Sequence, residues 1–206
     1  MGHQDLKHHW EKVYASKAEN EVSWFQAEPL TSLEFIRHCG GGTKVPMIDV
    51  GGGESRLVDR LLDAGYSDVT VLDLSENAIN ATRKRLGARA DGVQWIVSDI
   101  TSWRPSRKYR LWHDRAVLHF LTDPSDRMAY VSALLAATEP GSCVVISTFA
   151  LDGPEKCSGL PVVRYSTETL AAELGPGFRP VETIRDDHAT PWGSLQRFQF
   201  SRFTRL

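Results

Sequence analysis

The sequence has few cysteines, no long apolar run and no apolar N-terminal segment. Its three cysteines, Cys39, Cys143 and Cys157, are far apart and form no CxxC pair, so neither a disulfide framework nor a zinc knuckle is expected. Scattered cysteines in odd number are typical of a reducing compartment. No apolar run approaches the roughly 20 residues that span a bilayer, and the N-terminus lacks a signal-peptide core. These absences predict a cytoplasmic protein with no membrane partner.

A bias toward one sign of charge is also missing. The chain has 24 Lys and Arg residues against 26 Asp and Glu residues, a formal net charge of -2, so charge gives no support for a nucleic-acid partner. The short basic stretch Arg83-Lys84-Arg85 lies in a helical pattern and is interpreted as a solvated helix face. No group of His, Asp and Glu has metal-ligand spacing, so no metal is expected. The oligomeric state stays open.

The order of the hydrophobic patterns predicts an α/β fold. Short apolar runs alternate with helical patterns from Val45 onward, which is typical of a parallel sheet with helices on both faces. The last two apolar runs are joined by a loop alone, which predicts an antiparallel last strand. The expected fold is a Rossmann-like, seven-stranded, mostly parallel sheet. The expected strands cover residues 45–50, 69–72, 93–97, 109–113, 143–149, 181–185 and 196–203.

Helix patterns lie between these strands, and the whole chain of 206 residues fits one domain. A first helix is expected from Pro29 to the glycines at 40–42, and Ser75 is the expected N-cap of another. Further helices are expected over residues 57–62, 128–137 and 167–174. We divide the domain 1–206 into an N-terminal cap segment (1–42), a cofactor-binding core (43–150), and substrate-side loops with the C-terminal strands (151–206).

A glycine loop follows the first expected strand and gives the strongest functional signal. In Asp49-Val50-Gly51-Gly52-Gly53 the glycines allow a tight strand-to-helix turn and a close approach of a ligand to the main chain. A dinucleotide site needs Gly or Ala three residues after the second glycine, where this chain has Arg56. Asp49 would repel a pyrophosphate but suits a cationic aminoacyl group. The loop therefore favours a cationic nucleoside over a nicotinamide dinucleotide.

Two further acids end the next two expected strands. Asp73 follows the loop by about 20 residues, where a carboxylate can accept both ribose hydroxyls of an adenosine. Asp99 can accept from the adenine amino group, with Ile100 packing on the ring. Because the carboxyl ends of parallel strands meet at one edge of a sheet, we expect Asp49, Asp73 and Asp99 to surround one ligand.

These residues resemble those of the class I S-adenosylmethionine-dependent methyltransferases. The resemblance rests on the glycine loop, on Asp73, on Ser98-Asp99 and on Pro140-Gly141 before the fifth strand. It implies a methyltransferase with S-adenosyl-L-methionine as cofactor and S-adenosyl-L-homocysteine as product. The residues expected to bind the cofactor are Trp24, Asp49, Gly51, Gly52, Gly53, Ser55, Asp73, Leu74, Ser98, Asp99, Ile100 and Arg115.

The N-terminal half is similar to the lysine methyltransferases of elongation factor 1A and citrate synthase. The similar segments cover residues 9–14, 22–26, 53–57 and 61–66. In that group an N-terminal aromatic segment folds over the cofactor. The resemblance implies the same position for Trp10, Tyr14, Trp24 and Phe25.

The segment after the fourth expected strand, Asp114 to Leu121, looks more like small-molecule methyltransferases, including those that act on thiols and tellurite. Asp114 and His119 flank the strand end beside the expected methyl position and are the candidate catalytic residues. His119 is a candidate general base, and packing on the adenine or the sheet is the alternative. Asp114 is expected to order the loop or contact the cofactor. A thiolate would need no base, whereas an amine or hydroxyl must lose a proton.

Two long loops, at 148–161 and 187–194, are expected to form the walls of the substrate side. The chain has little beyond its core to dock a protein, so the preferred acceptor is a small-molecule nucleophile such as a thiol or other chalcogen species. The alternatives are protein-lysine N-methylation and a non-catalytic protein that binds S-adenosylmethionine. The residues expected on the substrate side are Tyr14, Phe25, Phe149, Cys157, Arg164, Tyr165, His188 and Trp192.

Overall fold

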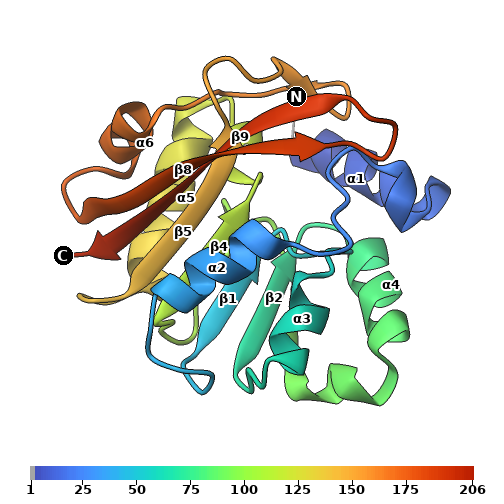
Figure 1. Ribbon diagram of the computed structural model, residues 1–206, viewed down its shortest axis with the longest axis horizontal. Helices are drawn as coiled ribbons and strands as arrows, with labels where there is room; N and C mark the ends of the chain where they lie inside the picture. The colour runs from blue at the N-terminus through green and yellow to red at the C-terminus, as the bar shows by residue number, and fades with distance from the viewer. Residues whose placement is uncertain (1–2) are drawn as a thin grey trace.

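The short apolar runs form one seven-stranded sheet in the computed structural model, which describes residues 3–206 (Figure 1). The strand order is β3-β2-β1-β4-β5-β9-β8, and β9 is antiparallel to both of its neighbours. The predicted fold class is thereby confirmed. The strands are β1 (Met47–Val50), β2 (Val69–Asp73), β3 (Val93–Val97), β4 (Leu111–Arg115), β5 (Cys143–Phe149), β8 (Phe178–Ala189) and β9 (Leu195–Arg205).

Six α-helices connect or cover the strands within the described residues, and some of their ends have typical caps. The Ser75 side chain accepts from the Ala78 backbone N–H, as predicted for an N-cap. Gly65 follows α3 with a φ of 85°, a left-handed conformation that favours glycine. The helices are α1 (His3–Ser16), α2 (Leu30–His38), α3 (Leu57–Asp63), α4 (Glu76–Leu86), α5 (Pro124–Ala137) and α6 (Thr167–Leu174), with 3-10 turns η1 (Glu19–Glu21), η2 (Gly87–Gly92) and η3 (Leu118–Phe120).

Helices cover both faces of the sheet because successive strand side chains point to opposite sides. In Figure 1, α2 and α3 lie in front of the sheet and α5 lies behind it. In β1, Ile48 and Val50 belong to the apolar cluster that contains Tyr130 and Leu134 of α5. Met47 belongs to the cluster on the other face, formed with α2, α3 and α4. Asp49 therefore points toward the face that α2 covers, and this orientation places it in the site described below.

The structure differs from the sequence expectation chiefly at the two ends of the chain. Helix α1 was not predicted, because its polar and aromatic residues form no simple apolar stripe. Strands β8 and β9 run well beyond the expected 181–185 and 196–203, and together they form a long hairpin (Figure 1). The loop after β5 contains a further small hairpin, β6 (Lys156–Cys157) with β7 (Leu160–Pro161). The division of the domain at residues 42 and 150 stays a prediction.

The cysteines also differ from expectation. Cys39, at the end of α2, and Cys143, the first residue of β5, form a disulfide with a Cα–Cα distance of 5.6 Å. The expectation of unpaired cysteines is therefore wrong for this pair. The two are 104 residues apart in sequence, and only the packing of α2 across the sheet brings them together, which spacing cannot reveal. Cys157 is free and buried.

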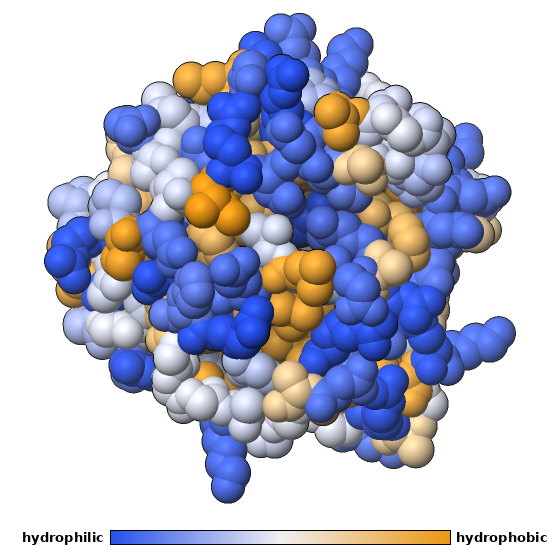
Figure 2. All heavy atoms as spheres, viewed as in Figure 1, coloured by the Kyte–Doolittle hydropathy of each residue, from blue (hydrophilic) through white to orange (hydrophobic). Residues whose placement is uncertain are grey.

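The surface has no long apolar helix and little continuous apolar area on the face that Figure 2 shows. Within residues 3–206, no helix is both long and apolar enough to cross a membrane. Figure 2 shows the face that carries α2 and α3 as mostly hydrophilic, with hydrophobic atoms in small separate areas. Scattered apolar residues of this kind are normal for a protein surface.

Candidate active site

Two adjoining cavities lie at the carboxyl ends of the parallel strands, as expected for a ligand of such a sheet. The first has a volume of about 840 Å³ and the second about 610 Å³, both including space open to solvent. The two cavities share the lining residues Tyr14, Trp24, Gly51 and Arg115.

The glycine loop borders both cavities and packs directly on two buried carboxyl groups. Gly51 has a φ of 71°, which explains the need for glycine at the turn. A Cβ at Gly52 would collide with the Asp49 carboxylate, and a Cβ at Gly53 would collide with Asp73. The second and third glycines are therefore required because each makes room for an acid at a strand end.

Asp49 is held by a buried chain of hydrogen bonds and keeps one oxygen without a partner. Its Oδ1 lies 2.7 Å from His113 Nδ1, and His113 Nε2 lies 3.0 Å from Ser32 Oγ. Its Oδ2 is buried and accepts no hydrogen bond from the described residues. All three residues line the second cavity. A buried carboxylate oxygen without a donor is costly, and the ammonium group of a ligand would satisfy it.

Asp73 is the last residue of β2, and Asp99 comes two residues after the end of β3. Both side chains line the first cavity. Asp73 accepts from the backbone N–H of Ser75 at 2.8 Å and is almost fully buried. Burial raises the pKa of its carboxyl to about 7, although hydrogen bonds from the Ser75 and Gly53 N–H groups act against this rise. Asp99 Oδ1 accepts from the backbone and the hydroxyl of Thr101. Leu74, Ser98 and Ile100 line the same cavity, so the predicted adenosine-side residues do come together.

Arg115 ends β4 at the junction of the two cavities. Its Nη1 donates to the Trp24 carbonyl at 3.0 Å, and its guanidinium lies over the Phe198 ring, 4.8 Å from the centroid. Its Nε and Nη2 are buried and have no hydrogen-bond partner among the described residues. Burial lowers the pKa of this guanidinium to about 10, so it stays positively charged at neutral pH. An unpaired buried cation of this kind favours an anionic ligand group.

Helix α1 covers the first cavity with Leu6, Trp10 and Tyr14. Glu11, on the same helix, caps the start of α4. It accepts from the Ser75 hydroxyl and from the backbone N–H groups of Glu76 and Asn77, at 2.8–3.1 Å. A carboxylate at a helix N-terminus is favoured by the helix dipole. Helix α1 therefore stays over the cavity through a contact at the edge of the site.

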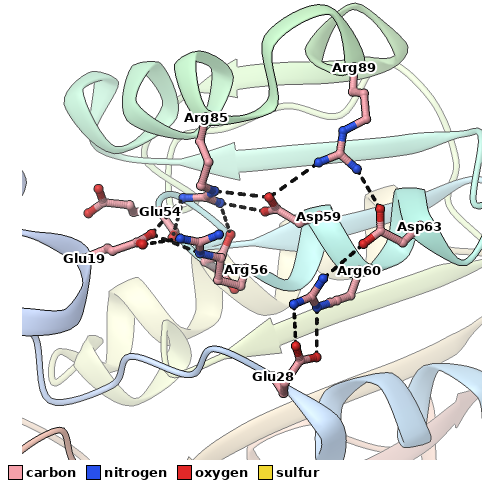
Figure 3. A network of polar contacts seen from close by, with 10 residues as sticks. Glu19, Glu28, Glu54, Arg56, Asp59, Arg60, Asp63, Arg85 and Arg89 are labelled. Atoms are coloured by element: carbon pink, nitrogen blue, oxygen red, sulfur yellow. Dashed lines mark hydrogen bonds and ion pairs between the residues drawn. The ribbon is translucent and has the colours of Figure 1, made fainter.

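The connection from α1 to α2 is held by ion pairs with α3 and α4 (Figure 3). Glu19 pairs with Arg56 and with Arg85, and Glu28 pairs with Arg60. The arginines are linked in turn to acids of α3, as Arg85 is to Asp59 and Arg60 and Arg89 are to Asp63 (Figure 3). Trp24 and Phe25, which line the second cavity, lie in the connection between these two anchors.

The far wall of the first cavity comes from the C-terminal part of the chain. Cys157 of β6 and Phe198 of β9 line it. The β6–β7 turn reaches α1, where Ser158 Oγ lies 3.1 Å from His9 Nε2. Burial raises the pKa of the Cys157 thiol to about 11, so this thiol is protonated at neutral pH. The cavity is thus closed by segments from both ends of the chain.

The two candidate catalytic residues lie away from these cavities. His119 is fully buried between Phe120 and Phe149, and burial lowers its pKa to about 3. It is not among the residues that line either cavity. Asp114 is also buried and accepts from the N–H groups of Val117 and Leu118 and from the Tyr130 hydroxyl. It orders the loop after β4, and His119 has the position of a packing residue and not of a base.

Several residues expected on the substrate side also lie elsewhere. Phe149 is in the core and Tyr165 is buried in the cluster behind the sheet. Arg164 pairs with Glu155, and Trp192 is 60% exposed at the tip of the β8–β9 hairpin. His188 is buried and lies 2.7 Å from the Ser23 carbonyl. Tyr14, Phe25 and Cys157 are the expected substrate residues that line a cavity, and Ser55 lines the second one as expected of a cofactor residue.

The sequence interpretation also missed residues that the structure places in the site. His113 and Ser32 were not singled out, because one lies inside an apolar strand and the other on a short helix. Their contact with Asp49 arises only when α2 packs on the sheet. Phe198 lies in an expected strand, but nothing in its spacing indicates that it faces Arg115.

The fold and the site together define a class of protein. A mostly parallel sheet with one antiparallel strand, a glycine loop packed on acids, and cavities at the carboxyl edge are the features of a Rossmann-like nucleotide-binding fold. Residues 47–141 match the family described as methyltransferase domain. This segment covers β1 to the turn before β5, which includes the three acids and Arg115. The predicted resemblance to the methyltransferases is thereby confirmed.

Curated relatives include a lysine and N-terminal methyltransferase and an O-methyltransferase. The chain is 27% identical over 122 residues to the eEF1A lysine and N-terminal methyltransferase of Mus musculus. This match covers 57% of this chain and 17% of that protein. It is 23% identical over 107 residues to malonyl-[acyl-carrier protein] O-methyltransferase 2 of Ilyobacter polytropus, which covers 52% of this chain and 40% of that protein. The chain thus spans less than half the length of either relative.

Solved structures share the fold over nearly the whole chain. A protein studied for the conversion of a disulfide bond into a thioacetal group during echinomycin biosynthesis superposes with a TM-score of 0.75 and 21% identity, over 97% of this chain and 92% of the other. The N-methyltransferase NodS from Bradyrhizobium japonicum, in complex with S-adenosyl-L-homocysteine, has a TM-score of 0.71 and 16% identity, over 95% and 97%. These structures share the Rossmann-like fold that the sequence predicted.

Proposed function

We propose that this protein transfers a methyl group from S-adenosyl-L-methionine to a small-molecule nucleophile, with a thiol or other chalcogen species preferred. The observation that carries the proposal is the pair of adjoining cavities. One wall holds acids at three neighbouring strand ends, and the other holds aromatic side chains and an unpaired cation.

The cofactor side would use residues that the core fixes in place. Asp73 and Asp99 would accept from the ribose and adenine groups, with Leu74, Ser98 and Ile100 beside the ring. Asp49 would hold the ammonium of the aminoacyl end through its free oxygen, next to Gly51, Gly52, Gly53 and Ser55. When bound, the cofactor supplies an electrophilic methyl carbon on a sulfonium. This chain binds it, orients it and keeps water away.

The acceptor side supports an anionic, soft nucleophile. The titratable residues that line the first cavity are Tyr14, Asp73, Asp99, Arg115 and Cys157. The two acids lie on the cofactor side, and burial keeps the Tyr14 hydroxyl and the Cys157 thiol protonated by raising the pKa of each. No residue of this lining is thus placed as a base for an amine. A thiolate needs no base, and the Arg115 cation favours its charged form.

The chemical step then balances without proton transfer to the protein. A thiolate would use one of its electron pairs to bond to the methyl carbon that the bound cofactor would supply. The methyl–sulfur bond would break with its electron pair left on the departing sulfur, so that S-adenosyl-L-homocysteine would leave as a neutral thioether. Alignment of nucleophile, carbon and leaving sulfur contributes about 7–11 kcal/mol in well-oriented reactions. Trp10, Tyr14, Trp24 and Phe198 form the walls that would provide this alignment.

The preference for a small acceptor has structural support, and the lysine alternative has support from relatives. Helix α1 and the β6–β7 turn enclose the first cavity, which favours a compact substrate. A solved protein of the same fold was studied for a reaction of a disulfide bond, which supports chemistry at sulfur. The eEF1A relatives instead support a protein lysine as acceptor.

The cytoplasmic location stays a prediction. The Cys39–Cys143 disulfide argues against it, because disulfides are rare in the cytoplasm.

The proposal is tested in two stages on the full chain. Calorimetry with S-adenosyl-L-homocysteine should give saturable binding that D73A weakens by about 100-fold. A methyl-labelled cofactor is then supplied with thiols, amines, hydroxyl compounds and a protein lysate. Label in a methylated thiol supports the proposal, and label in a protein band would move it to the lysine alternative. Binding without turnover of any acceptor would identify a non-catalytic binding protein, and no binding would refute the proposal.

A further inference from the structure

His113 connects Asp49, next to the glycine loop, to Ser32 of helix α2. Ser32 lies on α2, His113 on β4 and Asp49 on β1, and each is at most 2% exposed. The Ser32–His113 contact is 3.0 Å and the His113–Asp49 contact is 2.7 Å. Both ring nitrogens of His113 are thereby engaged, so the imidazole cannot rotate without losing two buried hydrogen bonds.

The donor types fix the positions of the protons in the hydrogen bonds from Ser32 through His113 to Asp49. A carboxylate only accepts hydrogen bonds, so His113 Nδ1 carries the hydrogen that it donates to Asp49 Oδ1. Ser32 can donate to a neutral Nε2 or accept from a protonated one, so it satisfies the ring in either state. The Nδ1–H donor toward Asp49 is therefore the constant feature.

The effect on Asp49 is to fix which oxygen remains available. With Oδ1 engaged by His113, Oδ2 is the buried oxygen without a partner among the described residues. That oxygen lies over Gly52, where any Cβ would collide with it. Without the His113 donor, the carboxylate would have two unpaired oxygens in a buried place and would turn toward any donor it could reach.

We propose that His113 is a positioning residue that orients Asp49 to receive an ammonium group in the second cavity. This inference rests on the proposed function, since the ammonium is that of the aminoacyl end of the cofactor. His113 acts through Asp49 and not on the reacting atoms. Ser32 fixes the other side of the ring and so links the placement of α2 to that of the acid.

The test compares two ligands on two matched variants. S-adenosyl-L-homocysteine carries the aminoacyl end, and methylthioadenosine lacks it. In H113N, the amide N–H lies near the place of Nδ1–H and can still donate to Asp49. In H113Q, the amide reaches toward the place of Nε2 and cannot. Affinities are measured by calorimetry with thermal melts of each variant, so that binding is read apart from activity and stability.

We expect H113Q to weaken S-adenosyl-L-homocysteine by about tenfold or more, as the loss of a charge-assisted hydrogen bond predicts. The affinity for methylthioadenosine should change by less than about twofold. H113N should keep most of the wild-type affinity for S-adenosyl-L-homocysteine. An equal loss for both ligands, no loss for either, or equal behaviour of H113N and H113Q would overturn the inference. Wild-type protein that binds neither ligand would instead refute the proposed function.

A spectroscopic reading covers the case in which H113Q fails to fold. Long-range ¹H–¹⁵N spectra of histidine-labelled wild-type protein should show His113 Nδ1 protonated before and after S-adenosyl-L-homocysteine is added. The D49N variant should shift this signal more than the signals of the exposed His38. A His113 ring with Nδ1 unprotonated would contradict the inference on its own.

Discussion

The two sides of the proposed active site are built in different ways. The cofactor side consists of residues at the ends of β1, β2 and β3, which are held by the sheet and by short local hydrogen bonds such as Asp73 with Ser75. The acceptor side consists of α1, the connection before α2, the β6–β7 hairpin and β9, which are brought together from both ends of the chain. The first side is therefore rigid and encoded locally, and the second depends on long-range contacts.

The largest expected effect is on the cofactor side, at Asp73. Substitution by alanine removes the acceptor proposed for the ribose hydroxyls and leaves the glycine loop without its buried partner. We expect D73A to weaken S-adenosyl-L-homocysteine by about 100-fold, since two hydrogen bonds to a charged group are lost. Calorimetry measures the affinity. D152A, on a surface carboxylate paired with Arg185, is the control, and a similar loss in that variant would contradict the site.

The next effect concerns Arg115, which lies on the border between the two sides. R115M keeps the contact with Phe198 but removes the charge, whereas R115K keeps the charge without the planar guanidinium. We expect R115M to raise KM for a thiol acceptor by about tenfold and to weaken S-adenosyl-L-homocysteine by only about threefold. R115K should recover part of the loss in KM. A larger loss on the cofactor than on the acceptor would assign Arg115 to the cofactor side, as first predicted from the sequence.

The pH dependence should separate the two sides further. Burial raises the pKa of Asp73 to about 7, above its ordinary value of 3.8, so in the free protein the carboxyl is protonated below that pH. Only the ionised form accepts from two hydroxyls, so affinity for S-adenosyl-L-homocysteine should rise about tenfold from pH 6 to pH 8. The D73N variant should show no such rise.

The same shift has an opposite effect on folding. A carboxyl whose pKa is higher in the folded state binds its proton more tightly there than in the unfolded chain. Its contribution to stability is therefore greatest at low pH and is lost as the pH rises from about 4 to about 7. Thermal melts of the wild type and D73N should diverge over this window, with the wild type losing more. Parallel melting curves would contradict a raised pKa.

This contrast also explains how much the sequence could predict. The strands, the glycine loop and the acids Asp49, Asp73 and Asp99 were predictable, because a strand end and the turn that follows it form from neighbouring residues. The acceptor side was not, because contacts such as Arg115 with Phe198 join residues far apart in sequence. His119 is the instructive case, because the sequence left open both a general base and a packing residue. It lies in the expected segment, but the turn of η3 directs its ring into the core instead of the cavity.

The smallest expected effect concerns the ion pairs that hold the connection before α2. Glu19 and Glu28 anchor this connection to Arg56, Arg85 and Arg60 (Figure 3), yet all of these pairs are partly exposed, and exposed pairs contribute little and are screened by salt. The double variant E19Q/E28Q should therefore weaken S-adenosyl-L-homocysteine by only about twofold at low salt, because the connection that carries Trp24 samples open positions more often.

The salt dependence of the affinity tests that effect more sharply. The difference between E19Q/E28Q and the wild type should vanish near 1 M salt, where the screening length is about 3 Å. E139Q, which removes the partner of Arg110 at the opposite edge of the sheet, should leave affinity unchanged at every salt concentration. No loss in E19Q/E28Q even at low salt would mean that the connection is held by packing of Val22 and Trp24 and not by charge. The acceptor side would then be more rigid than its assembly from distant segments implies.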